Sequence, residues 1–230
     1  AIDSQEIYTD TNLGSSASGG GTDAFLQNLS NVSSGTTGSL VDLSYLQFDF
    51  TSISSSFNFN FLFASNEYGA FQCLSNDIFA FELTDLTTGI ITNIAVIPTT
   101  TNPISVKFIK DALYNGTCSS TNPTLFDIYN VSNPAASTLN MRGHTVVMSA
   151  GANITPLNPY RLKLVIADYI SSNFDSAVFI SAGSFTTDFT LGPDQTICSG
   201  DSFTLDTLLD STYSYQWFLG GTPIAGAINA

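Results

Sequence analysis

Residues 57–63 read Phe-Asn-Phe-Asn-Phe-Leu-Phe, and this alternation decides the fold class. Neighbouring side chains of a β-strand point to opposite faces, so the phenylalanines share one face of this segment. The same period of two recurs at 46–50, 79–83 and 162–166. Further apolar segments of strand length lie at 90–97, 104–109, 125–131, 144–150 and 176–186. The sequence therefore predicts an all-β chain.

About nine short strands separated by Gly, Asn, Pro and Ser clusters are typical of a lectin-like β-sandwich or jelly roll. Helix signals are nearly absent, because five basic residues cannot supply many i,i+4 ion pairs and β-branched and aromatic residues dominate. The Gly- and Ser-rich segment 12–23 is expected to be a loop. A second long loop is expected at 111–124, where it carries Cys118.

The composition changes near residue 187, which predicts two domains, 1–187 and 188–230. Gly192-Pro193-Asp194 has the composition of a linker turn, and Cys198 is followed by Trp217. A cysteine followed about twenty residues later by a tryptophan is typical of the first half of an immunoglobulin-like β-sandwich, which needs about 100 residues. The second segment is therefore expected to be the truncated front of such a domain in a longer protein. The alternative is a short extension with a free thiol.

Charge limits the function classes. The chain has 5 Lys and Arg against 19 Asp and Glu, and its net charge is −14. Binding to nucleic acid or to anionic membranes is not expected, because both need clustered cations. Unpaired carboxylates are either solvated or bound to divalent cations.

The cysteines and the chain start favour a secreted protein. Of the three cysteines, two are expected to form a disulfide and one is left over. Their spacing fits no zinc site, and no apolar stretch is long enough for a transmembrane helix. Ala1-Ile2-Asp3 suits a mature N-terminus left after signal-peptide removal.

The segment 63–85 places oxygen-bearing side chains in a loop between two apolar strands. These are Glu67, Asn76 and Asp77. Calcium takes six to eight hard oxygen ligands, which loops between strands can supply. Two aromatic residues of the same loop, Tyr68 and Phe71, are candidates for contact with a ligand.

The segment 164–185 carries a second acidic group. Asp168 has the alternation parity of the apolar residues at 162–166, so its carboxylate continues a core-facing register. Such a group needs a cation or hydrogen bonds, and Asp175 follows in the next loop. Calcium ligation is one interpretation of these acids, and hydrogen bonding to turn backbone is another. An acid–base pair of Glu67 and Asp77 for glycoside hydrolysis is a third.

Four segments, in order, resemble the choice-of-anchor L domain of secreted surface proteins in Bacteroidetes. They are FASNEYGAFQC at 63–73, NDIFAFEL at 76–83, IPTTTNPISV at 97–106, and LKLVIADYISSNFDSAVFISAGSF at 162–185. The tail from Leu191 is similar to the immunoglobulin- or PKD-like repeats that follow this domain. Such proteins commonly end in a type IX secretion sorting domain, and the family includes proteins of gliding bacteria.

The resemblance implies a lectin-like sandwich with no catalytic motif and a disulfide between Cys73 and Cys118. It also favours Ca²⁺ bound by residues of the matching segments: Glu67, Asn76, Asp77, Asp168 and Asp175. Two departures weaken the metal prediction. Asn66 stands where relatives often have an acid, and Tyr169-Ile170-Ser171 replaces a loop richer in Gly and Asp.

The leading functional hypothesis is an extracellular adhesin or ligand-binding module of the cell surface, Ca²⁺-stabilised and binding a glycan or protein. The main alternative is a structural subunit or tip of an extracellular filament or gliding fibre, which would self-associate through strand edges. A carbohydrate-active enzyme is a weaker alternative. The only histidine, His144, lies in no catalytic motif, so no enzymatic activity is expected.

Overall fold

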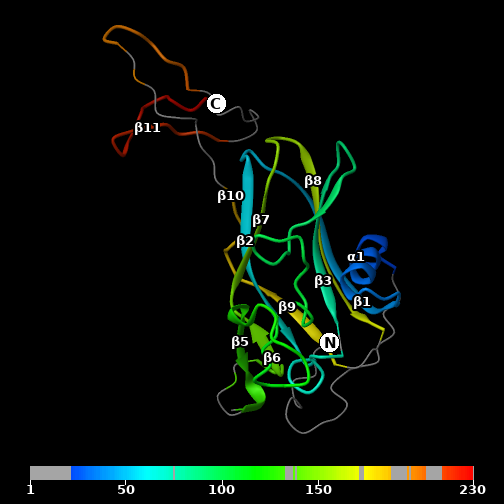
Figure 1. Ribbon diagram of the computed structural model, residues 1–230. Coiled ribbons are helices and arrows are strands. Elements are labelled where there is room, and N and C mark those ends of the chain that lie inside the picture. The colour runs from blue at the N-terminus through cyan, green and yellow to red at the C-terminus, as the bar shows by residue number, and fades with distance from the viewer. Residues whose placement is uncertain are drawn as a thin grey trace.

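The computed structural model describes residues 22–74, 76–132, 137, 139–170, 174–187, 196, 198–205 and 214–229. Most of the loop predicted at 12–23 lies outside these residues. Two antiparallel sheets form the main body (Figure 1). The prediction of an all-β sandwich is confirmed.

The first sheet has the strand order β1-β8-β3-β4, with bounds Leu40–Thr51, Pro159–Tyr169, Ile78–Asp85 and Ile91–Asn93. The second sheet is built around β2, Ser56–Ser65, which pairs with every strand of that sheet except β5. Its other members are β5 (Phe126–Tyr129), β6 (Gly143–Thr145), β7 (Met148–Asn153), β9 (Ser176–Ile180) and β10 (Thr186–Thr187). Two short 3-10 helices, Pro123–Leu125 and Asn130–Ser132, flank β5.

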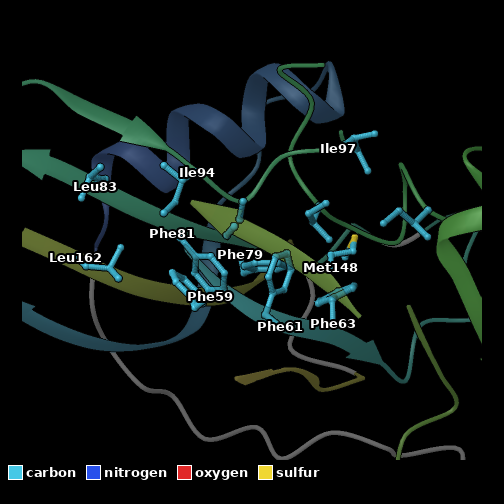
Figure 2. Close-up of a cluster of buried hydrophobic side chains, with 14 of the residues drawn as sticks. Phe59, Phe61, Phe63, Phe79, Phe81, Leu83, Ile94, Ile97, Met148 and Leu162 are labelled. Atoms are coloured by element: carbon cyan, nitrogen blue, oxygen red, sulfur yellow. The ribbon is translucent and has the colours of Figure 1, made fainter. Parts of the chain in front are cut away.

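Phenylalanine rings from both sheets fill the space between them (Figure 2). Those of β2 meet Phe79 and Phe81 of β3, and the ring centroids of Phe61 and Phe81 lie 5.0 Å apart at 81°. Edge-to-face pairs of this kind add stability beyond the burial of their area. The prediction that the β2 phenylalanines form the core is confirmed, because all four are almost completely buried.

A helix, α1 (Ala24–Ser34), covers the outer face of the first sheet and makes a third layer (Figure 1). Leu26 of α1 packs on Val165 and Ala167 of β8, so β8 is apolar on both faces. Helix signals are nearly absent from the sequence, and α1 is the one α-helix among the described residues. Asp23 accepts the N–H of Leu26 as an N-cap at 2.8 Å, and Gly35 ends the helix in the left-handed conformation at φ 72°.

Lysine 107 closes the C-terminal end of α1. Its Nζ donates to the carbonyl oxygens of Ser33 at 2.6 Å and Ser34 at 2.9 Å. A cation is favourable there because the last carbonyls of a helix carry partial negative charge. Among the described residues, no helix is long and apolar enough to cross a membrane.

Two apolar segments differ from the predicted pattern. Residues 104–109 form turns and isolated bridges rather than a strand, although Ile104, Val106 and Ile109 are fully buried. β1 lies at the edge of its sheet, so Leu46 and Phe48 are only partly covered despite having core parity. Burial alone therefore does not distinguish a strand from a packed loop.

The described parts of 188–230 contain a two-stranded hairpin, β11 (Phe218–Leu219) and β12 (Thr222–Pro223). The turn between them uses Gly220 and Gly221, both at positive φ. Cys198 is exposed and not disulfide-bonded. The partial immunoglobulin-like domain and the boundary at 187 stay predictions.

Replacing Phe81 by alanine should lower the free energy of unfolding by about 3–5 kcal/mol, because it removes a ring from the close-packed centre and leaves a cavity. Chemical denaturation monitored by far-UV circular dichroism measures the change in the free energy of unfolding. Leu113→Ala is the matched control, since Leu113 is exposed and should change the value by less than about 0.5 kcal/mol. Equal effects of the two substitutions would contradict the proposed core.

Candidate functional site

Four strands place acidic residues at the same end of the sandwich. β2 and β8 finish there, and β3 and β9 begin there, as the pairings Ser65 with Ser176 and Ile78 with Ala167 show. Asp77 directly precedes β3, and Asp168 is the penultimate residue of β8. Residues far apart in the sequence therefore gather into what we call the carboxylate end: Asp42, Glu67, Asp77, Asp168 and Asp175.

Asp77 is the most enclosed carboxylate of this group, with 1% of its surface exposed. Ser176 Oγ donates to its Oδ2 at 2.7 Å, and its own backbone N–H donates to Glu67 Oε2 at 3.0 Å. Its other oxygen, Oδ1, is buried and has no hydrogen-bond partner among the described residues. A buried charged oxygen without a partner is costly, so Asp77 requires a proton or a cation.

Asp168 lies beside Asp77 and is also buried. It occupies the core-facing parity expected from the sequence, next to Ile166 in β8. A register shift in β1 between Val41 and Ser44 brings Asp42 toward it, and Asp42 itself has φ 51°. No residue pattern indicated Asp42, because the irregularity in the edge strand that positions it has no sequence signature.

Burial and the crowding of like charges raise the pKa values of two of these acids, Asp77 and Asp168. Burial first, and then the charge of Glu67, raise the pKa of Asp77 well above 3.8. Burial raises the pKa of Asp168 to about 9, with further contributions from Asp77, Asp175 and Asp42. Neither Asp77 nor Asp168 has a Lys or Arg ion-pair partner within the described part of the chain. The group therefore binds protons readily when no metal is present.

Neutral groups surround the acids. Asn76 Oδ1 accepts from Ser105 Oγ at 3.1 Å, while its buried Nδ2 lacks a hydrogen-bond partner in the described residues. The backbone carbonyl of Asp175 accepts the N–H of Asn66 at 3.0 Å. Asn66, in turn, accepts the N–H of Arg142 through its side-chain oxygen at 3.0 Å. Asn66, where relatives often have an acid, therefore links the loops that carry Asp175 and Arg142.

The carboxylate oxygens of this group suit a hard cation, but the side chains alone do not form a complete coordination sphere. Asp77 and Asp42 both act on the carboxyl group of Asp168, and Asp77 Oδ1 and Asp42 Oδ2 are buried without hydrogen-bond partners among the described residues. Across the described residues, however, no three or more His, Cys, Asp or Glu side chains are arranged as metal ligands. Any bound ion would also need backbone, amide or water oxygens, which Ca²⁺ accepts.

The two aromatic residues of the same loop differ in exposure. The prediction that Tyr68 contacts a ligand is wrong, because Tyr68 is completely buried and packs on Phe126 at 4.6 Å between centroids. Phe71 is only half-buried; its ring stacks on Phe174 at 3.9 Å, with the Arg142 guanidinium 5.4 Å from its centroid. Phe71 therefore remains a candidate for ligand contact.

A disulfide fixes the loop that carries Phe71. Cys73 is bonded to Cys118, as the family resemblance implied, and the bond joins loops 45 residues apart in sequence. Asn115 Nδ2 reinforces this link by donating to the carbonyl oxygens of Gly69 and Ala70, at 3.0 and 3.1 Å. The 66–77 loop is therefore held from both the carboxylate end and the 111–124 loop.

An acid–base pair of Glu67 and Asp77 is not supported by this geometry. Both side chains are almost completely buried, whereas glycoside hydrolysis needs two carboxyl groups flanking a bound sugar.

Comparison with known proteins gives one match. Residues 2–186 match the family model described as the Choice-of-anchor L domain. No curated protein and no solved structure matches the chain.

In metal-free protein, the acids of the carboxylate end should make unfolding easier as pH rises. The folded pKa values of Asp77 and Asp168 lie above the unfolded value of 3.8, so the stability that these two acids contribute is complete below that pH and is lost toward about pH 9. Asp168→Asn removes one ionisable group and should raise the free energy of unfolding near pH 8 by roughly 1–3 kcal/mol. Denaturant titrations in excess chelator measure this difference.

Asp127→Asn is the control, since Asp127 has a largely exposed side chain and should change stability little at any pH. If Asp168→Asn had a lower free energy of unfolding than the native chain in chelator at the same pH, repulsion among these carboxylates would be contradicted.

Proposed function

The chain belongs to the Choice-of-anchor L domain family, and on that premise we propose that it is an adhesive module whose carboxylate end binds Ca²⁺ and orders a ligand-binding loop. The family consists of non-catalytic surface modules, which makes this a secreted or cell-surface protein. The observation that carries the proposal is the burial of Asp77 and Asp168 together without a basic partner in the described residues.

Calcium suits this group for two reasons. The chain's 19 acids outnumber its 5 bases, so an external cation is the simplest source of compensating charge. Extracellular modules bind Ca²⁺ with dissociation constants of about 10⁻⁴–10⁻³ M, a range in which partly formed sites suffice. Asp77 and Asp168 would hold the ion, with Glu67, Asp175 and the amide oxygen of Asn76 as further ligands. The bound ion would neutralise carboxylates that otherwise need protons.

The ion's role would be to order the loop next to it. Glu67 and Asp77 lie at the two ends of the segment that carries Phe71, and Phe174 stacks on Phe71 from just before Asp175. Fixing these backbones would hold a stacked aromatic pair and the Arg142 guanidinium in one arrangement. Half-exposed aromatic rings suit contact with the apolar faces of sugar rings, and the polar groups beside them suit hydrogen bonds with the hydroxyls of a glycan. We infer a cell-surface glycan as the ligand class.

A second candidate function, a structural subunit, has a separate observation in its favour. β1 is an edge strand that exposes Tyr45 and Leu46 beside a largely apolar cavity of about 280 Å³, which Phe81 and Ile180 also line. Exposed apolar edges are the usual sites of strand addition. A second copy of this chain pairing along β1 would cover that surface.

Chelation should lower the melting temperature near neutral pH, and Ca²⁺ should restore it, because a ligand of the folded state stabilises by mass action. At 100-fold excess over the dissociation constant, the gain is about 2.7 kcal/mol. Calorimetry with and without EDTA measures it. Asp77→Asn should lose most of the response, and Asp127→Asn should keep it. Identical melting curves of the native chain in EDTA and in Ca²⁺ would reject the metal.

Phe71→Ala should weaken binding to immobilised cell-surface polysaccharide about tenfold, because it removes the stacking face. Leu113→Ala, an exposed substitution on the 111–124 loop, should leave binding unchanged. Biolayer interferometry in Ca²⁺ measures both, and melting curves check that each variant is folded. Concentration-dependent assembly without any glycan, together with no polysaccharide binding, would favour the structural alternative.

A further inference from the structure

A second acidic group lies on the opposite face of the first sheet, beneath α1. Glu82 of β3 and Lys163 of β8 are directly opposite each other in the strand ladder. Asp23, which precedes α1, lies over them, and Lys163 Nζ is in direct contact with Asp23 Oδ2. One amine and two carboxyl groups are thereby brought together from three separate parts of the chain.

This group is enclosed, in contrast to an ordinary surface ion pair. Asp23 and Glu82 are 6% and 5% exposed. The side chain of Lys163 is 18% exposed, with its Nζ 4.9 Å from the centre of the Tyr45 ring. The neighbouring pair on the same sheet, Asp49 and Arg161, has side chains that are 50% and 40% exposed.

The surroundings are apolar on the side of α1, whereas Gln47 and Asn93 flank the group in the strand ladder. Leu26 of α1 packs against Ala80 and Val165, the next residues on this face of β3 and β8. Isolating an ion pair from water in this way is costly unless every polar atom is satisfied. Glu82 Oε1 is buried and has no hydrogen-bond partner among the described residues. A buried ion pair with an additional buried carboxyl group is expected to add little to the stability of the fold, so stability alone does not explain this arrangement.

Glu82 is poised to donate a proton. Burial first, and then the charge of Asp23 and a hydrogen bond with it, raise the pKa of Glu82 to about 8. Near neutral pH it is therefore mainly a carboxylic acid, next to the carboxyl group that Lys163 contacts.

We propose that Lys163 and Asp23 are joined by an intramolecular amide bond between Nζ and Cγ, formed with Glu82 as the proton-transfer catalyst. In this step the N–C bond forms and the bond from Cγ to Oδ2 breaks. Glu82 gives its proton to the Asp23 carboxylate and takes one from the Lys163 ammonium, which leaves a neutral amine to attack a neutral acid. The proton then lost by nitrogen passes through Glu82 to Oδ2, which leaves as water.

The atoms and charges balance. An ammonium and a carboxylate become an amide and one water molecule, Glu82 is regenerated, and no oxidant or energy source is consumed. Burial of Asp23 and Glu82 limits the access of water to the group, and this favours the amide over hydrolysis because water is itself the product that leaves.

The helix end assists the same step. Asp23 Oδ1, the oxygen that stays, accepts the backbone N–H of Leu26 at 2.8 Å. Negative charge develops on this oxygen when the amine adds to Cγ, and a fixed N–H at a helix N-terminus stabilises such charge. After reaction, Oδ1 is the amide carbonyl oxygen and continues to cap α1. The bond would link residues 140 apart in the sequence.

Intact-mass spectrometry of the full chain tests the proposal. The folded protein should be lighter than its sequence by one water molecule, in addition to the two hydrogens lost in the disulfide. Tryptic digestion after unfolding and reduction should yield one branched peptide that contains both Asp23 and Lys163, with no cleavage after Lys163. Lys163→Arg should have the full sequence mass, because a guanidinium does not form this bond.

Glu82→Gln keeps both joined residues and should retain the native circular dichroism spectrum, yet lack the water loss. Asp49→Asn is the matched control, since it removes the exposed ion pair on the same sheet and should keep the bond. A native chain of full mass, with Asp23 and Lys163 in separate peptides, would overturn the proposal. A loss of water mapped to any other residue would do the same. Formation of the bond in Glu82→Gln at the native rate would show that Glu82 is not the catalyst.

Discussion

The structure depends on a shortage of positive charge: 5 basic residues serve a chain with 19 acidic ones. Each basic residue is committed to a tertiary contact. Lys107 binds the end of α1, Arg142 lies over Phe71, and Lys110 Nζ donates to the carbonyl of Gln72 at 3.4 Å. Arg161 and Lys163 lie on β8 and pair with Asp49 and Asp23. The carboxylate end receives no basic partner for Asp77 or Asp168 within the described residues, and this makes an external cation or a proton necessary there.

Strand β8 separates two kinds of carboxyl chemistry. Lys163 and Asp168 are five residues apart, so the alternation of a strand sends them to opposite faces. On the helix side, Lys163 meets Asp23 and Glu82 beneath α1. On the core side, Asp168 continues the row of Leu162 and reaches the loops at the end of the sandwich. The same period of two that builds the core therefore also divides the charged groups into two independent sites.

The sequence predicted most of the long strands and the position of Asp168 correctly because both follow from alternation, whereas 104–109 is a buried loop. It failed where a feature depends on partners distant in the sequence. The helix α1 has few strong helix formers, yet Asp23 and Gly35 cap it and the face of β8 stabilises it. Asp42 joins the carboxylate end only through an irregularity of β1, and Tyr68 turns inward because Phe126 and Phe63 enclose it.

The scarcity of lysine and arginine also affects how long the protein survives outside the cell. Secreted proteases of the trypsin type cut after these two residues, and only five such peptide bonds exist in 230 residues. Arg161 and Lys163 stand in the middle of a paired central strand, while the backbone of Lys110 is hydrogen-bonded to Thr121 in both directions. Proteolysis requires local unfolding before the chain can enter an active site, so the composition that leaves the acids uncompensated also makes the folded module a poor protease substrate.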